Sequence, residues 1–126
     1  MTIGPIETVR VFTADLARAK AFYEEVLGLT PLIADAGGAC LYDTGQAKLL
    51  LEQIEPGEAE ADLLVGRFAG FSFTVEAMAD VVADLTPKGV RFTGPPEPQD
   101  WGGVLAHFAD PDGNILTLVE YPKDSP

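Results

Sequence analysis

Few side chains in this sequence are suited to chemistry. His107 is the only histidine, and an imidazole can donate or accept a proton near neutral pH. It is a candidate for ligand contact or for acid–base catalysis, while the alternative is a structural histidine held by hydrogen bonds on a half-buried strand. Cys40, the only cysteine, lies in the apolar stretch Ala39–Tyr42, where we expect a packed and inert thiol.

Arg10 and Trp101 are further candidates for ligand contact. An arginine that faces a cavity binds a carboxylate or phosphate through two hydrogen bonds, whereas a surface arginine here would pair with Glu7 or Asp15. Trp101 stands in a stretch rich in proline and glycine, which suits either an aromatic lid or a subunit interface.

Asp110 and Asp112 are acidic and close together, but the sequence Asp-Pro-Asp-Gly is typical of a turn. Carboxylates in such turns accept hydrogen bonds from nearby backbone amides. We therefore expect turn-forming residues here and not a pair of metal ligands.

A repeated order of elements must position these residues. Each half begins with a strand rich in branched or aromatic residues, followed by an amphipathic helix that ends at a glycine and then by three strands. The expected helices cover residues 16–27 and 78–88, and the expected strands cover residues 6–12, 32–34, 39–43, 48–53, 71–75, 90–93, 104–108 and 115–121. The sequence thus predicts an α+β domain, 1–126, of two βαβββ modules, about 5–54 and 68–122, joined by a loop at about 55–67.

Composition limits the partners. A chain of 126 residues that is 47% hydrophobic fits one globular domain. Eight Lys and Arg against 20 Asp and Glu give a formal charge of −12, which repels phosphate backbones and anionic lipids, so neither nucleic acid nor membrane is expected as a partner. The N-terminus has no basic region followed by an apolar core, so the expected location is the cytoplasm.

The segments Asp15–Leu29 and Phe108–Asn114, together with the repeat, resemble the vicinal oxygen chelate superfamily. This superfamily includes glyoxalase, extradiol dioxygenases and the bleomycin- and fosfomycin-resistance proteins. The resemblance covers nearly the whole chain. It implies a glyoxalase-like fold, in which each module curls into a half-barrel and the modules enclose a cavity, and it implies a homodimer. In catalytic members the cavity holds a divalent metal.

The resemblance places the four metal-ligand positions at Thr8, Leu49, Gly70 and Thr117. Two of these residues offer a neutral hydroxyl and two offer no donor, whereas a metal needs several imidazole or carboxylate donors that converge on it. We therefore expect no cofactor. A nonstandard metal site that uses Glu52 or His107 is the alternative.

Strand alternation and the resemblance together suggest which residues face the cavity. The expected ligand-contacting residues are Thr8, Arg10, Phe12, Ser72, Thr74, Trp101, Leu105, His107 and Thr117. The resulting hypothesis is a metal-free protein that binds a small organic molecule, such as an antibiotic or metabolite. The alternatives are a lyase, isomerase or dioxygenase with a nonstandard metal site or with His107 as acid or base, and an accessory module that binds another protein.

Overall fold

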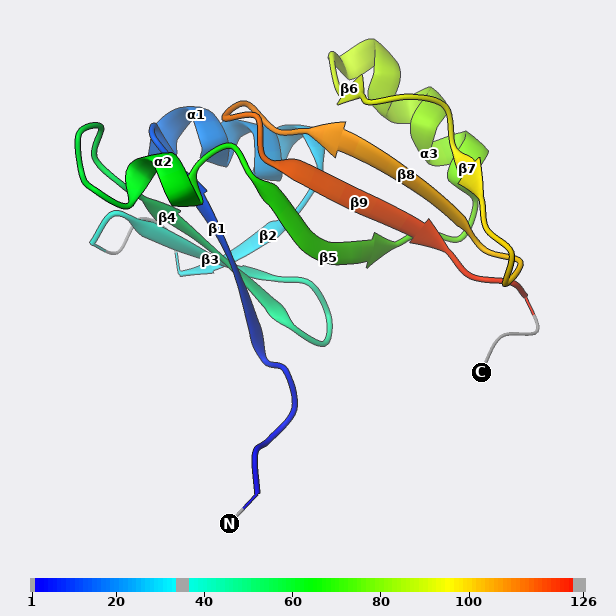
Figure 1. Ribbon diagram of the computed structural model, residues 1–126, viewed down its shortest axis with the longest axis horizontal. Helices are drawn as coiled ribbons and strands as arrows, with labels where there is room; N and C mark the ends of the chain where they lie inside the picture. The colour runs from blue at the N-terminus through cyan, green and yellow to red at the C-terminus, as the bar shows by residue number, and fades with distance from the viewer. Residues whose placement is uncertain (1, 34–36, 124–126) are drawn as a thin grey trace. The chain divides into compact units, whose positions relative to one another are not determined.

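A computed structural model describes residues 2–33 and 37–123 of the chain. The chain divides into two compact units, Met1–Gly66 and Arg67–Pro126, and each unit has its own sheet (Figure 1). The predicted α+β class with a glyoxalase-like fold is confirmed. None of the described helices is long and apolar enough to cross a membrane.

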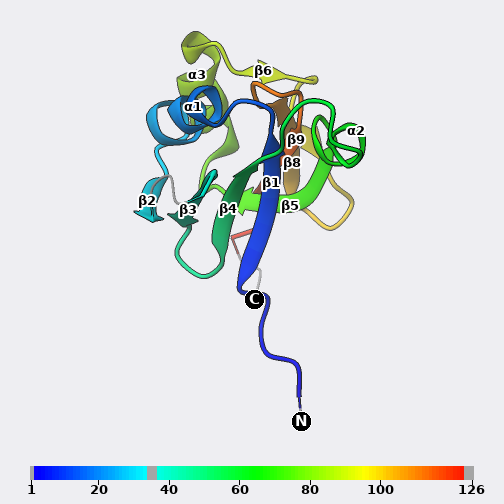
Figure 2. The same ribbon diagram turned by 90° about the vertical axis from the view of Figure 1, so that its left-hand side faces the viewer.

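Unit 1 contains a four-stranded mixed sheet. Its strands are β1 (Thr8–Thr13), β2 (Thr30–Ile33), β3 (Ala39–Asp43) and β4 (Lys48–Gln53). They lie in the order β1-β4-β3-β2, as Figure 2 shows, with β1 parallel to β4 and the other pairs antiparallel. The strand expected at 32–34 begins two residues earlier, and its last residue, Ala34, is outside the described residues.

The helix of unit 1 lies against β4. It begins as α1 (Leu16–Ala21) and continues through a π-helical turn, η1 (Phe22–Val26). The Asp15 side chain caps its first turn by accepting a hydrogen bond from the amide of Arg18, and Gly28 follows it with a positive φ of 78°. The buried side chains of this helix, Leu16, Ala19 and Tyr23, recur at three- and four-residue steps and cover the apolar face of the sheet.

Unit 2 repeats this plan. Its strands are β5 (Phe68–Thr74), β6 (Arg91–Phe92), β7 (Glu97–Pro98), β8 (Val104–Ala109) and β9 (Ile115–Glu120). Figure 1 shows β5, β9 and β8 side by side, with β5 parallel to β9, while β6 and β7 each pair with β8. The helix α3 (Met78–Leu85) continues into a short 3-10 turn, η2 (Thr86–Lys88), which ends at Gly89.

One contact occurs at the same place in both units. The side chain at the end of the last strand accepts a hydrogen bond from the first backbone amide of the helix: Gln53 from Leu16 at 2.8 Å, and Glu120 from Met78 at 2.6 Å. These bonds satisfy an amide that the helix itself leaves without a partner. They also give a fixed point at which the two modules can be aligned.

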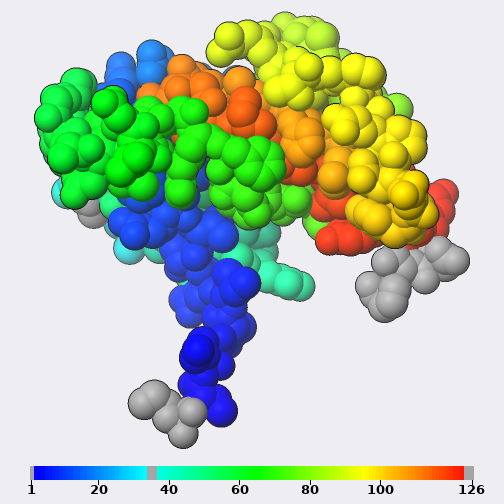
Figure 3. Space-filling view, in the orientation of Figure 1, coloured from blue at the N-terminus to red at the C-terminus, as the bar shows by residue number. Residues whose placement is uncertain are grey.

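The expectation about the loop between the modules is wrong in part. The loop expected at 55–67 contains a short helix, α2 (Ala61–Leu64), whose sequence Ala-Asp-Leu-Leu includes good helix formers. The proline- and glycine-rich segment from Gly94 to Gly103 contains β7, and together with β6 it forms much of the yellow surface in Figure 3.

Candidate functional site

The strand registers settle which residues of the two modules correspond. Arg10 pairs with Leu50 in unit 1, as Ser72 pairs with Thr117 in unit 2. Leu50 stands three residues before the capping Gln53, just as Thr117 stands three residues before the capping Glu120. Leu50 is therefore the counterpart of Thr117.

The position predicted for this counterpart, Leu49, is wrong by one residue. Leu49 is fully buried, and it shares the apolar face of the sheet with Val11 and Leu51. Residues 49–51 are three leucines in a row, so alternation along this strand could not show which leucine faces which side. The correction leaves the donor count unchanged, because Leu50 also lacks a donor.

Five predicted residues share one face of the unit 2 sheet, which we call the His107 face. They are Ser72, Thr74, Leu105, His107 and Thr117. His107 pairs directly with Thr117 across β8 and β9, and its Nδ1 lies 2.9 Å from Thr117 Oγ1. Thr117 is only 4% exposed, His107 is half-buried, and Ser72, which pairs with Thr117 from the other side, is exposed.

The contact with Thr117 fixes the orientation of the His107 ring. In the described part of the chain, His107 Nε2 has no hydrogen-bond partner. If the Thr117 hydroxyl donates to Nδ1, the ring carries its proton on Nε2 and donates outward; if Nδ1 donates, Nε2 accepts. The pair can therefore meet either a donor or an acceptor on a bound molecule.

Phe68 is a member of this site that the sequence analysis missed. Its ring centre lies 5.9 Å from that of His107, and the side chain is 60% exposed. The strand was expected to begin at Phe71, but β5 begins at Phe68 and its register shifts before Ser72. Phe68 lies an even number of residues before Ser72 and Thr74, and this spacing is the sequence signal that places all three on one face of a strand.

Trp101 packs against a neighbouring aromatic ring. Its ring centre lies 5.7 Å from that of Tyr121, and both side chains are about half exposed. A side chain at Gly103 would clash with the indole as it lies here, so a larger residue there requires the Trp101 ring to move. Whether Trp101 contacts a ligand or a partner stays a prediction.

Unit 1 presents the other predicted residues on what we call the Arg10 face. Its members are Thr8, Arg10, Phe12, Leu50 and Glu52. Arg10 pairs with Glu52, and not with Glu7 or Asp15, which were the partners expected under the alternative of a surface arginine. Its Nε and Nη2 donate to Glu52 Oε1 and Oε2 at 2.6 and 3.2 Å, and this hydrogen bond, followed by the charge of Glu52, raises the pKa of Arg10.

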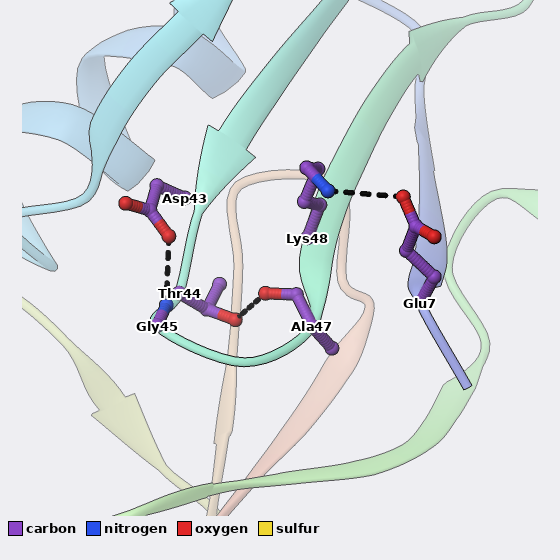
Figure 4. A network of polar contacts seen from close by, with 6 residues as sticks. All are labelled: Glu7, Asp43, Thr44, Gly45, Ala47 and Lys48. Carbon is purple, nitrogen blue, oxygen red and sulfur yellow. Dashed lines mark hydrogen bonds and ion pairs between the residues drawn. The ribbon is translucent and has the colours of Figure 1, made fainter. Parts of the chain in front are cut away.

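Glu7 and Asp15, the acids named as partners of a surface Arg10, have other roles. Glu7 accepts a hydrogen bond from Lys48 Nζ at 3.0 Å, as Figure 4 shows. The same figure shows the neighbouring turn, in which the Asp43 carboxylate accepts a hydrogen bond from the amide of Gly45 and the Thr44 hydroxyl donates one to the carbonyl of Ala47. Asp15 caps α1. An alternation of strand residues cannot identify such partners, because they depend on which strand lies next to β1.

The turn prediction for Asp110 is confirmed. Asp110 Oδ1 accepts hydrogen bonds from the amides of Asp112 and Asn114, and its Oδ2 accepts one from Asn114 Nδ2. Asn114 Oδ1 in turn accepts from the amide of Arg67, which ties the turn to the start of β5. Cys40 is buried, as expected.

The sequence matches the family model described as the Glyoxalase/Bleomycin resistance protein/Dioxygenase superfamily over residues 5–118. The chain belongs to this superfamily. It is 31% identical to a bleomycin resistance protein of Klebsiella pneumoniae over 114 residues, which cover 84% of each chain.

Two solved structures have the same fold as this chain. TnmS3, an antibiotic binding protein from Streptomyces sp. CB03234, aligns with a TM-score of 0.79 and 26% identity, over 97% of this chain and 99% of its own. A superfamily member from Sphaerobacter thermophilus aligns with a TM-score of 0.77 and 27% identity, over 94% and 98%.

The four superfamily metal positions do not fit a divalent metal in this chain. With the register corrected, they are Thr8, Leu50, Gly70 and Thr117, which offer no imidazole or carboxylate. Gly70 has a φ of 83°, a conformation that would cost an L-residue such as histidine about 1–2 kcal/mol. Among residues 2–33 and 37–123, no group of three or more His, Cys, Asp or Glu side chains could hold a metal ion.

Proposed function

We propose that the protein binds a small organic molecule at the His107 face without a metal ion. The observation that carries this proposal is the 2.9 Å contact between His107 Nδ1 and Thr117 Oγ1. Thr117 stands at the superfamily's metal position on the final strand, and its hydroxyl orients the imidazole of His107. The position is thereby suited to hydrogen bonding with an organic group.

The surroundings favour a ligand that combines a polar group with an apolar part. His107 Nε2 and the exposed hydroxyl of Ser72 supply hydrogen-bonding groups, and the exposed ring of Phe68 supplies an apolar surface. A few placed polar groups within apolar surroundings are typical of small-molecule sites. The likeness to a bleomycin resistance protein and to an antibiotic binding protein makes antibiotics the first compounds to test.

Catalysis by His107 as an acid or base has less support. Such a role needs a partner that orients the ring and stabilises the imidazolium once it takes a proton. Thr117 orients the ring, but its hydroxyl is neutral. A nonstandard metal site with Glu52 or His107 is also less favoured, because Glu52 is held by Arg10 and because, among the described residues, His107 has no second and third imidazole, thiol or carboxylate donor beside it.

We further propose that the protein is a homodimer. The superfamily resemblance implies a two-fold dimer, and unit 1 exposes the large apolar side chains Ile6 and Leu63, which a partner subunit would cover. Light scattering coupled to size-exclusion chromatography should give twice the 13.4 kDa mass of the chain. A monomer mass at all concentrations would contradict the proposal.

A thermal-shift screen of antibiotics and metabolites, run with EDTA present, tests the binding proposal. A ligand at about 100 times its Kd should stabilise the protein by about 2.7 kcal/mol. We expect His107→Ala and Thr117→Val to weaken binding of such a ligand at least about tenfold, because each removes one half of the recognising pair.

Asp84→Asn is the matched control, because Asp84 lies on α3 and pairs with Lys88 at 3.2 Å, away from the His107 face. This variant should bind as the wild type does. Equal binding by wild type, His107→Ala and Thr117→Val would contradict the assignment of the site.

A further inference from the structure

Unit 1 contains a pocket of about 320 Å³ at the linker between the modules, which we call the linker pocket. Its lining includes the side chains of Ala14, Ile54, Pro56, Ala61, Asp62 and Val65. The first two of these residues directly follow β1 and β4, and the others belong to the linker. All of them lie within unit 1, and none is a member of the Arg10 face. The volume is within the range of small-molecule sites.

Backbone hydrogen bonds hold the linker around this pocket. The amide of Glu58 donates to the carbonyl of Glu55 at 3.2 Å, that of Ala61 to Glu58 at 3.1 Å, and that of Val65 to Ala61 at 3.0 Å. The amide of Ile54 donates to the last residue of β1 at 2.9 Å, and the Ile54 side chain is buried. Because these turns follow one another, the pocket is formed before a ligand binds, which limits the entropy cost of binding.

Asp62 is the one charged residue that lines the linker pocket, and the other side chains of the lining are apolar. In the part of the chain that the structure describes, the Asp62 carboxylate has neither a hydrogen bond nor an ion pair. A few polar groups within an apolar lining are typical of sites for small organic molecules. A lining of this kind, with a single unpaired carboxylate, complements a ligand that has a hydrocarbon body and one positive charge.

The charge around the linker pocket favours a cation as well. Residues 55–62 contain four acids, Glu55, Glu58, Glu60 and Asp62, and no lysine or arginine. Glu55 accepts a hydrogen bond from the side-chain amide of Gln53 at 2.9 Å, and Glu58 accepts one from the amide of Glu55 at 3.1 Å, but no described cation pairs with any of the four. Such a potential attracts cations and repels anions. The acids alone would attract any cation, and the apolar lining selects one with a hydrocarbon body.

We propose that the linker pocket binds a compact organic ammonium ion, with Asp62 opposite the positive charge and the apolar lining around the hydrocarbon body. Burial of that body supplies most of the binding free energy, because it removes apolar surface from water. Asp62 is exposed, so its attraction is screened by solvent and serves mainly to select the sign of the charge. The site lies on the linker of unit 1 and does not depend on the function proposed for the His107 face.

Nuclear magnetic resonance of the full-length, ¹⁵N-labelled protein tests the proposal with four probes. The first probe, 2-phenylethylammonium, has both the charge and the hydrocarbon body, and it should shift the amide signals of residues 54–65 in a saturable way. The second, 2-phenylethanol, keeps the body without the charge and should bind about three- to fivefold more weakly. Methylammonium keeps the charge without the body, and 3-phenylpropanoate reverses the charge; neither should give a saturable shift of these signals.

Two substitutions separate the carboxylate of the pocket from the charge of the whole chain. Asp62→Asn removes the negative charge at the pocket, and we expect it to weaken binding of 2-phenylethylammonium about three- to fivefold while binding of 2-phenylethanol stays the same. Asp80→Asn is the matched control: Asp80 is an exposed acid in the first turn of α3, as Asp62 is in α2, and the net charge changes by the same amount. This variant should bind 2-phenylethylammonium as the wild type does.

Several results would overturn the proposal: no saturable shift at residues 54–65 with 2-phenylethylammonium, equally tight binding of 2-phenylethanol, or equal effects of Asp62→Asn and Asp80→Asn. If 2-phenylethylammonium instead shifts the signals of Ser72, His107 and Thr117, and His107→Ala abolishes these shifts, it is a ligand of the His107 face. In that case the proposed function stands and the linker site falls. If the linker signals respond as expected while no screened compound responds to His107→Ala, the reverse holds.

Discussion

Threonine hydroxyls at positions 8 and 117 are neutral, so neither can supply the negative charge that commonly balances a divalent cation. Thr117 instead lies 2.9 Å from His107 Nδ1. On the other unit, Arg10 and Glu52 neutralise each other. At the scale of residues, the His107 face therefore offers hydrogen-bonding groups and an aromatic ring in place of a cluster of charges, which supports the proposed recognition of an organic molecule.

A different residue, Tyr42, should make stability depend on pH in the alkaline range. Burial, followed by hydrogen bonds with Cys40 and Glu24, raises the pKa of Tyr42 above its ordinary value; its hydroxyl donates to Glu24 Oε2 at 2.8 Å. A raised pKa in the folded state stabilises the protein fully below the unfolded pKa of about 10, and this contribution is lost as the pH rises above it. We expect the free energy of unfolding to fall as the pH rises above about 10.

Tyr42→Phe should reduce that fall, because it removes the ionisable group. Tyr121→Phe, at an exposed ring, is the matched control and should retain the wild-type slope. Urea denaturation at each pH gives the comparison. If the free energy of unfolding falls with pH as steeply in Tyr42→Phe as in the wild type, ionisation of Tyr42 is not the cause of the fall.

At the scale of elements, the signals that the sequence analysis interpreted correctly are those with a local physical cause. Gly28 and Gly89 follow the helices with positive φ, and Asp110 forms the turn through its own backbone neighbours. The start of β5 and the linker helix α2 were missed because packing and backbone hydrogen bonds, and not composition, set those boundaries. The register of β4 was missed because residues 49–51 are all leucine, so the alternation of apolar and polar residues could not show which of them faces the core.

Asn114 should be essential to unit 2, because it joins the Asp110 turn to β5. It is 1% exposed, donates to Asp110 and accepts from the amide of Arg67. Asn114→Ala leaves buried polar groups without these partners, and we expect it to reduce the free energy of unfolding by about 2–4 kcal/mol. Urea denaturation measures this value.

Gln99→Ala is the control for that experiment, because the side-chain amide of Gln99, just after β7, donates one solvent-exposed hydrogen bond to the carbonyl of Glu97. Its effect should lie within about 0.5 kcal/mol. If Asn114→Ala has as small an effect as Gln99→Ala, the bonds through Asn114 do not hold the turn in place.

At the scale of the whole molecule, the chain consists of two units that repeat one plan, each with its own sheet, helix and capping side chain. The repeat and the superfamily resemblance could be predicted from the sequence, because both rest on the order and spacing of residues along the chain. The partner of Arg10 could not, because Glu52 lies on a strand that is distant in the sequence. Thr117, the partner of His107, lies on the next strand, and its pairing depends on the register that the turn sets between β8 and β9.

The central claim is that the superfamily fold serves organic recognition here without its metal. Mass spectrometry of metal content tests this most directly, on protein purified without chelators and again after incubation with zinc, nickel, iron or manganese and desalting. We expect far less than one metal ion per chain in every sample, because Thr8, Leu50, Gly70 and Thr117 supply no imidazole or carboxylate donor. One tightly bound ion per chain would contradict the account.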